Sequence, residues 1–531
     1  MHRRNLLAGA AGVPLLAGLS RPALAQANAS RVLRFVPQSD VTVLDPILTT
    51  AYVTRHHGYA VWDTLYGFDA DYKPQPQMAE GHAVEEDGKR VTIRLRPGLK
   101  FHDGEPVRAR DAVASIRRWA ARDALGQVLM SQVAELAAPD DRTIAFRLNK
   151  PFPLLFEALG KPSTPVCFIM PERIASTDPN TAIRDMIGSG PFKWVAGDRV
   201  PGSRVVYERF ADYVPREGGE PSWTAGPKRA NLDRIEWQVI PDAATAAAAL
   251  QNNEVDWWEQ PTADLQPTLR RNRNVVMEIP DPTGLCGILR FNHLHPPFNN
   301  PAIRRALLGA VVQGDYMTAV IGTDRSLWKD GVGFFPPGTP LANDVGLDAL
   351  NSPRDMEKVK RDLAAAGYNG EKVVVIAASD FPSLNALAQV GGDMLRKAGM
   401  NVEYVSTDWG SVVTRRANRG APDQGGWSVF FTFWAGLDMF NPGVSQALRG
   451  HGQNAWFGWP TIPRLEELRG AWFDAPDLAA QQRVAQDVQR VAFEEVPFLP
   501  LGQYFQATAY RRNISNVPKG FPMFWSVTKS A

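Results

Sequence analysis

Residues 373–405 contain two short apolar runs separated by a segment of helical length, and this arrangement constrains the fold more than any other feature of the chain. Residues 373–377 and 402–405 are strand-like, and residues 383–398 form a helix that ends at Gly399. Two strands joined through a helix run parallel, so the sequence predicts an α/β fold with a parallel or mixed sheet. Ligands of such sheets bind beyond the carboxyl ends of the strands. Trp409, in the loop that leaves the second strand, is therefore a candidate site residue.

Other segments alternate between strands and helices. Residues 76–187 contain two half-buried strands, with alternating apolar positions around Ile93 and Phe146, and a helix that Asp111 is expected to cap. This stretch is typical of a small α+β unit. Later helices are predicted to begin at Asn300-Pro301 and at Ser352-Pro353, the second ending at Gly367.

Length and charge limit the function classes. A chain of 531 residues corresponds to two to four domains, and we find no flexible linker, so we expect lobes joined by several chain crossings. The net charge of +2 does not indicate a nucleic-acid or anionic-membrane partner. Cys167 and Cys286 have no CxxC spacing; they form either a disulfide or, as we expect, two separate buried thiols.

The first 25 residues have the pattern of an export signal. Arg3 and Arg4 precede an apolar stretch, and Ala23-Leu24-Ala25 is typical of a signal-peptidase site, so we expect cleavage before Gln26. The paired arginines resemble a twin-arginine signal, although His2 stands where Ser or Thr is usual. No cysteine lies near the cleavage site and no later segment is apolar enough to cross a bilayer, so we expect a periplasmic protein without a lipid anchor or stable membrane insertion.

Motifs for catalysis, metals and cofactors give no convincing pattern. His102, Asp103 and Glu105 are spaced as in a tight turn, without a matching His or Cys set nearby. The sequence contains no GxSxG, GxGxxG or GxxxxGK[ST] motif. We therefore expect no metal, no cofactor and no enzymatic activity, while a catalytic triad of scattered residues stays an open alternative.

A series of segments carries a resemblance to a known family. The series comprises residues 59–68, 87–111 (DGKRVTIRLRPGLKFHDGEPVRARD), 188–192, 205–213, 232–236, 240–242, 254–256, 291–292, 297–299, 303–306, 355–368 and 496–500. In this order they resemble the dipeptide- and oligopeptide-binding proteins of extracellular solute-binding protein family 5, over about residues 31–515.

This resemblance implies a large, two-lobed periplasmic-binding-protein-like clamshell of type II, with mixed sheets and three domains. Domain I would comprise residues 26–75, 188–280 and 498–531, domain II residues 76–187, and domain III residues 281–497. The lobes would be joined near residues 279–281 and 496–501. The resemblance further implies a monomer that captures a small-molecule or peptide solute and delivers it to the permease subunits of an ABC transporter.

The resemblance and the aromatic residues of the third domain suggest candidate ligand-binding residues. Trp409 and Arg416 match a ligand-contacting tryptophan and an arginine near the ligand, and a cleft arginine binds carboxylates well. Trp427 and Trp434 offer aromatic surface for a cleft, although large proteins also bury tryptophans in their cores. Arg416 has the alternative interpretation of a solvated surface charge.

Residues 432–438 occupy the place where peptide-binding members carry an aspartate for the α-amino group of the ligand. Phe433, Ala435 and Asp438 are candidates here, but an ungapped alignment puts Leu437 at the aspartate position. Asp438 serves as an amine anchor only if the loop shifts by one residue. Asp45, before Pro46, is another candidate, with a turn residue as the alternative.

Three functions remain open on the sequence. The first is solute capture for import; the second is a secreted hydrolase; the third is a ligand-sensing partner of a chemoreceptor. The identity of the solute, whether peptide, glutathione, opine, sugar or metal complex, does not follow from the fold.

Overall fold

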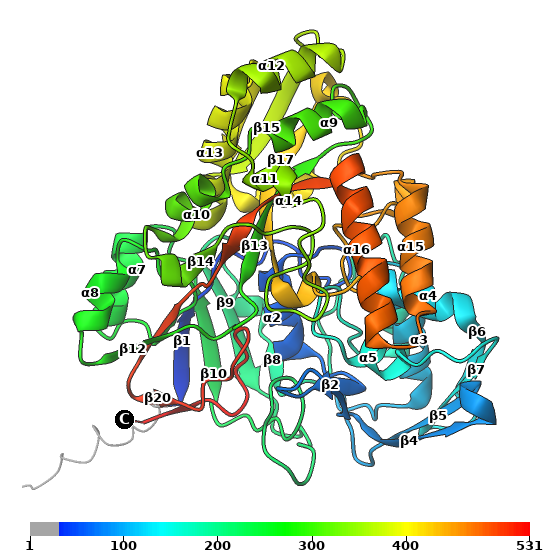
Figure 1. Ribbon diagram of the computed structural model, residues 1–531. Coiled ribbons are helices and arrows are strands. Elements are labelled where there is room, and N and C mark those ends of the chain that lie inside the picture. The colour runs from blue at the N-terminus through cyan, green and yellow to red at the C-terminus, as the bar shows by residue number, and fades with distance from the viewer. Residues whose placement is uncertain (1–30, 531) are drawn as a thin grey trace, which may run out of the picture.

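The computed structural model describes residues 31–530 and consists of two lobes built on three large sheets (Figure 1). Two further sheets have two strands each: β2 (Tyr66–Phe68) with β3 (Pro74–Pro76), and β20 (Ile514–Ser515) with β21 (Thr528–Lys529). The large lobe contains a seven-stranded and a four-stranded sheet, and the small lobe contains a six-stranded sheet. The expected export signal, residues 1–25, lies outside the described residues. In Figure 1 the small lobe is at the top, with the two sheets of the large lobe below it.

The seven-stranded sheet is mixed. In sheet order its strands are β12 (Val275–Glu278), β19 (Thr508–Arg511), β11 (Trp257–Trp258), β1 (Val32–Val36), β10 (Arg234–Gln238), β9 (Arg204–Arg209) and β8 (Phe192–Trp194). β1 is parallel to both β10 and β11, while the other pairs are antiparallel. Phe35 packs against Trp237 and Trp257 at the centre of the core beneath this sheet.

The four-stranded sheet is antiparallel, with the order β4 (Ala79–Glu85), β5 (Arg90–Leu95), β7 (Thr143–Leu148) and β6 (Val133–Ala137). Its two central strands alternate between buried and exposed positions, as the sequence predicts for a half-buried sheet. Helix α3 (Ala109–Ala120) covers the buried face. The helix begins before Asp111, which therefore lies inside the first turn, where its carboxylate accepts the backbone N–H of Arg108 and of Glu172.

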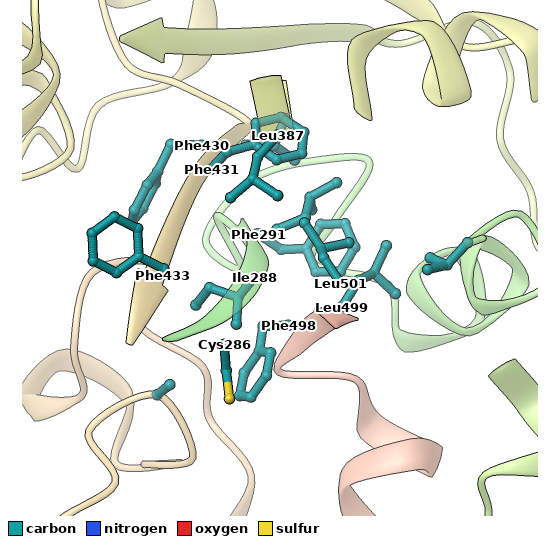
Figure 2. Close-up of a cluster of buried hydrophobic side chains, with 14 of the residues drawn as sticks. Cys286, Ile288, Phe291, Leu387, Phe430, Phe431, Phe433, Phe498, Leu499 and Leu501 are labelled. Carbon is teal, nitrogen blue, oxygen red and sulfur yellow. The ribbon is translucent and has the colours of Figure 1, made fainter. Parts of the chain in front are cut away.

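The six-stranded sheet has the order β14 (Trp328–Lys329), β18 (Phe498–Tyr504), β13 (Leu285–Phe291), β17 (Val429–Ala435), β15 (Lys372–Ala378) and β16 (Asn401–Thr407). β15 is parallel to β16 and to β17, which confirms the predicted βαβ unit through α13 (Pro382–Lys397). β13, β17 and β18 are buried along their whole length because helices and loops cover both faces. Figure 2 shows Leu387 of α13 beside Phe431 of β17, in a cluster that also contains Leu501 of β18.

The remaining helices flank these sheets. In the large lobe they are α2 (Tyr52–Val61), α4 (Ala124–Gln132), α5 (Leu155–Gly160), α6 (Glu172–Ala175), α7 (Ala243–Gln251) and α8 (Gln266–Arg271). In the small lobe they are α9 (Pro301–Leu308), α10 (Gln313–Ile321), α11 (Asp348–Asn351), α12 (Met356–Ala365), α14 (Trp409–Arg415), α15 (Pro463–Phe473) and α16 (Leu478–Glu495). Asn300 caps α9 as expected, whereas α12 begins after Asp355, three residues beyond the predicted Ser352-Pro353 start.

The chain crosses between the lobes twice. The first crossing, residues 279–284, links β12 to β13, and the second, residues 505–507, links β18 to β19. β18 pairs with β13 as far as Tyr504, so the second crossing comes a few residues after the expected 496–501. Cys167 lies in the large lobe and Cys286 in the small lobe, and both are buried free thiols.

Candidate functional site

Three adjacent cavities lie between the lobes, and Gln38 lines all of them. We call one of them, about 280 Å³, the outer cavity; it is lined by the loops after β1 and β11 of the large lobe and after β15 and β16 of the small lobe. The crossing cavity, about 60 Å³, lies beside both chain crossings. The arginine cavity, about 20 Å³, contains Arg416 in its wall. Together they form the interlobe cleft.

Arg416 is a buried cation at the end of α14. Its side chain is 1% exposed and is surrounded by aromatic rings, which the guanidinium carbon approaches to 4.7–5.8 Å; these belong to Trp409, Phe430, Trp456 and Phe457. The only side-chain hydrogen bond that it donates is to Thr49 Oγ1 across the cleft, at 3.2 Å, and no carboxylate of residues 31–530 lies within ion-pair distance. Burial lowers the pKa of Arg416 to about 9, so the group is still charged at neutral pH. A buried charge without a counterion favours an anionic ligand.

Trp434 and Phe433 of β17 line the arginine cavity beside Arg416. The indole Nε1 of Trp434 is buried and has no hydrogen-bond acceptor among the described residues. Its ring packs edge-on against Trp456 at a centroid distance of 5.0 Å. The arginine cavity therefore presents two donors, the guanidinium and an indole N–H, whose hydrogen-bonding capacity is not satisfied within the protein.

Trp409 separates the outer cavity from the arginine cavity and lines both. It begins α14, which Asp408 caps by accepting the N–H of Ser411 at 2.8 Å. The backbone N–H of Trp409 donates to Asp380 Oδ1 at 2.7 Å, and its ring packs edge-on against Phe381. The βαβ topology therefore places Trp409 at the cleft, where the sequence predicts it.

Asp438 lines none of the three cavities. Its carboxylate accepts hydrogen bonds from the hydroxyl of Tyr52 and from the backbone N–H of Thr164, the latter at 3.2 Å. The Tyr52 hydroxyl in turn accepts the N–H of Ala435 at 2.5 Å, and Ala435 lines the crossing cavity. In this arrangement the Tyr52 hydroxyl bonds the Asp438 carboxylate, which the sequence suggested as the partner of a ligand amine.

Asp45 and Trp427 also lie away from the cavities. Asp45 forms a buried bidentate pair with Arg118, at 2.7 and 3.1 Å, and accepts the N–H of Ile47 within a turn. Trp427 is fully buried in the small lobe, where its indole N–H donates to the carbonyl of Arg416 at 3.1 Å. Trp427 thus supports the end of α14 and does not face the cleft.

The crossing cavity contains charged residues that sequence reasoning missed. Arg55 lies between the rings of Tyr52 and Phe521, at 4.3 and 3.9 Å from their centroids. His56 Nδ1 is 3.5 Å from Glu259 Oε1, and burial raises the pKa of Glu259 to about 8. Arg55 and His56 are consecutive helix residues without a motif, and Glu259 is distant in the chain, so no local pattern indicates that they meet.

Two general features complete the description. Within residues 31–530, no helix combines the length and apolarity that a bilayer span requires. The same residues contain no group of three or more His, Cys, Asp or Glu side chains arranged to hold a metal ion.

Comparisons with known proteins agree with this architecture. The model of the bacterial extracellular solute-binding proteins, family 5 (middle), matches residues 73–456. A probable peptide ABC transporter periplasmic-binding protein of Sinorhizobium fredii is 35% identical over 537 residues, covering 100% of both chains. The glutathione-binding protein GsiB of Escherichia coli is 23% identical over 530 residues, covering 97% of this chain and 96% of the other.

Solved structures share the fold at low sequence identity. The binding protein AgaA of A. tumefaciens, in complex with agropinic acid, is 21% identical with a TM-score of 0.75, covering 94% of this chain and 99% of the other. The protein DppA of Helicobacter pylori, in complex with the peptide STSA, is 21% identical with a TM-score of 0.76, covering 94% and 98%. Both support the large two-lobed clamshell described above.

Proposed function

The chain belongs to family 5 of the bacterial extracellular solute-binding proteins, and from this premise we propose that it captures a peptide-like solute bearing a free carboxylate and delivers it to the permease of an ABC importer. The single observation that supports a carboxylate on the solute is the position of Arg416. Its guanidinium is buried at the cleft and has no anionic partner among the described residues. A bound carboxylate would neutralise this charge and satisfy its free N–H groups by charge-assisted hydrogen bonds.

The names of relatives support an acidic, peptide-sized solute. A probable peptide transporter component, a glutathione-binding protein and a structure with agropinic acid are among the similar proteins. Glutathione, agropinic acid and peptides with a free C-terminus all carry carboxylates. Trp409 and Trp434 would contribute rigid aromatic walls beside the anchored group.

The two crossings would act as the hinge. We propose that the seven-stranded sheet corresponds to domain I, the four-stranded sheet to domain II and the six-stranded sheet to domain III, and that residues 279–284 and 505–507 absorb the backbone changes of opening. A ligand that contacts both lobes stabilises the closed state, which a permease can distinguish from the open one. The protein would work in the periplasm after export directed by the twin-arginine-like residues 1–25.

Native mass spectrometry of the protein purified from periplasm, beginning at Gln26, tests this function. We expect an excess mass that fragments to a solute with a carboxylate, and we expect Arg416→Gln to lose it. Arg419→Gln is the matched control, because Arg419 is exposed on the same segment and bonds Gln453. Retention of the same solute by Arg416→Gln, or a solute without an acidic group, would contradict the proposal.

A further inference from the structure

We infer that the outer cavity is a subsite for a positively charged group of the solute, an ammonium or a guanidinium, which Asp40 of the large lobe and Asp380 of the small lobe bind together. This inference rests on the proposed function and specifies its solute: a molecule with a carboxylate at Arg416 and a cationic group at the other side of Trp409.

The wall of the outer cavity is negatively charged. The lining contains three carboxylates, those of Asp40, Asp380 and Asp408, and it contains no Lys, Arg or His. Asp408 is committed to its helix, since its two oxygens accept from the backbone and the hydroxyl of Ser411. Arg199, the arginine that contacts this loop, donates to the carbonyl of Val41 and does not line the cavity. Negative charge in the cavity is therefore not neutralised by its own walls.

Asp40 and Asp380 each retain binding capacity. Asp40 is half-buried; its Oδ2 accepts the N–H of Gly202 at 2.8 Å, while its Oδ1 has no partner among the described residues. Asp380 is exposed to the cleft; its Oδ1 accepts the N–H of Trp409, and partial desolvation raises the pKa of this carboxyl, with the neighbouring charge of Asp408 adding to the shift. A cation between Asp40 and Asp380 would offset the repulsion between these negative charges.

Ser39 contributes a buried hydroxyl to the same cavity. It is only 9% exposed and lines the outer cavity, yet its Oγ has no hydrogen-bond partner among residues 31–530. The unsatisfied hydroxyl of Ser39 and the unsatisfied Oδ1 of the following residue, Asp40, suit a ligand with several N–H donors, which both an ammonium and a guanidinium supply.

The aromatic wall favours an organic cation over a hydrated metal ion. Trp258, Phe381 and Trp409 line the same cavity, and their rings attract a desolvated alkylammonium or guanidinium. Metal binding would need a closer set of ligands, and within the described residues no three metal-ligating side chains come together.

The positions of Asp40 and Asp380 also couple binding of the cation to closure of the two lobes. Asp40 and Asp380 belong to opposite lobes, so closing the cleft brings two negative charges into one cavity. Their repulsion opposes closure in the absence of a cation, and a bridging cation removes it. Because Trp409 and Phe381 line both the outer and the arginine cavities, one solute spans both charged subsites.

Competitive capture from an equimolar mixture of synthetic tripeptides tests the subsite. The mixture contains Ala-Lys-Ala, its Nε-acetylated form, and both again with an acetylated N-terminus, so that peptides with two, one or no positive charges share one backbone. The purified protein is unfolded and refolded to remove any resident solute, and native mass spectrometry quantifies the captured peptides, with fragmentation of the released peptides to separate the two isomeric mono-acetylated forms. We expect the wild type to prefer a charged form over its acetylated counterpart by about tenfold or more, the scale of one charge-assisted contact.

The double variant Asp40→Asn, Asp380→Asn is expected to lose this preference and still capture the peptides. Asparagine retains an acceptor for Gly202 and for Trp409, so the variant removes charge with little change in hydrogen bonding. Asp393→Asn, an exposed aspartate of α13 that pairs with Lys397, is the matched control and should behave as the wild type. A wild type that captures peptides without regard to charge, or a double variant with unchanged preference, overturns the subsite and leaves the proposed function standing. A wild type that captures none of the tripeptides overturns both.

Discussion

The hydroxyl of Tyr52 donates a hydrogen bond across the closed cleft to the carboxylate of Asp438. Tyr52 belongs to α2 of the large lobe, and Asp438 follows β17 of the small lobe. Burial raises the pKa of Tyr52 and that of Asp438, so at neutral pH the phenol keeps its proton and remains a donor. The pair thus joins the lobes at the wall of the crossing and arginine cavities, which Tyr52 lines and Asp438 does not.

Removing the phenolic hydroxyl should weaken the closed state. Tyr52→Phe leaves the N–H of Ala435 without its acceptor and removes one of the two donors to Asp438, at a cost of roughly 1–3 kcal/mol. Because Tyr52 and Asp438 act on the same bond, the effects of Tyr52→Phe and Asp438→Asn on ligand affinity should be non-additive by about 0.5–3 kcal/mol. Calorimetric titration of both single variants and the double variant measures this coupling. Strict additivity would show that the bond does not contribute to closure.

Arg416→Met should weaken solute binding and, at the same time, make the ligand-free protein more stable. Methionine retains contact with the aromatic rings around Arg416 but removes a buried charge that has no counterion among the described residues, so we expect the ligand-free protein to be more stable by about 1–2 kcal/mol. The same variant should lose at least tenfold in solute affinity, about one charge-assisted hydrogen bond. Urea unfolding and titration measure the two effects. A loss of stability together with unchanged affinity would assign Arg416 a structural role only.

The buried Glu259 makes stability depend on pH. Its pKa of about 8 in the folded protein exceeds the ordinary value of 4.5, so between these values the folded state holds a proton that the unfolded chain has released. This group therefore lowers the free energy of unfolding as the pH rises from 4.5, and the loss is complete above pH 8. The positive charge of Arg55 opposes this rise in the pKa of Glu259, and His56 Nδ1 lies 3.5 Å from Glu259 Oε1.

Glu259→Gln should remove this dependence. A glutamine accepts the N–H of Gln38 as the carboxyl does, and it stays neutral at every pH. We expect the variant to gain on the wild type from pH 5 to pH 8, reaching roughly 2–4 kcal/mol at pH 9. Thermal and urea unfolding at pH 5, 7 and 9 measure the difference. An advantage that is the same at all three pH values would contradict a protonated Glu259.

Arg118→Met should destabilise the large lobe without changing ligand specificity. Arg118 and Asp45 form a buried pair in which Arg118 also donates to the carbonyls of Thr177 and Thr181. Removing the arginine leaves the Asp45 carboxylate uncompensated, at a cost of about 3–5 kcal/mol. Arg110→Met, on the exposed side of α3, is the control. A change in relative affinity for different solutes, instead of stability, would restore Asp45 as a ligand residue.

The sequence predicted the local elements of the fold well where hydrophobic periodicity and caps agree. The βαβ unit of β15, α13 and β16 matches its predicted segments within two residues at most boundaries, because both strands and the helix carry strong patterns. The start of α12 was less accurate: the pair Ser352-Pro353 suggests a helix start, but the side chain of Asp355 provides the actual cap. When two turn signals lie a few residues apart, the sequence pattern alone does not show which of them begins the helix.

The position of a candidate site residue could be predicted from the sequence only where the sheet topology determines it. Trp409 follows a parallel strand, so its place at the cleft follows from the sheet. Trp427 and Asp45 have equally suggestive side chains, but Trp427 points into the small lobe and Asp45 pairs with Arg118, 73 residues away in the chain. The cluster of Arg55 and Glu259, and the opposition of Asp40 to Asp380, depend on how the lobes meet, which no local pattern encodes.

The position of β19 has a consequence for how the protein matures. β19, formed by residues 508–511, lies between β12 and β11 and so completes a sheet whose first strand is β1. A nascent chain that has not yet released residues 508–511 from the ribosome cannot close this sheet, and the small lobe likewise waits for β18 to fill the place between β13 and β14. Neither lobe is finished until residues 498–511 are available. Loss of residues from 508 onward would leave the β12 strand without a neighbour, so truncation before β19 should yield a degradable chain and not a partly working binding protein.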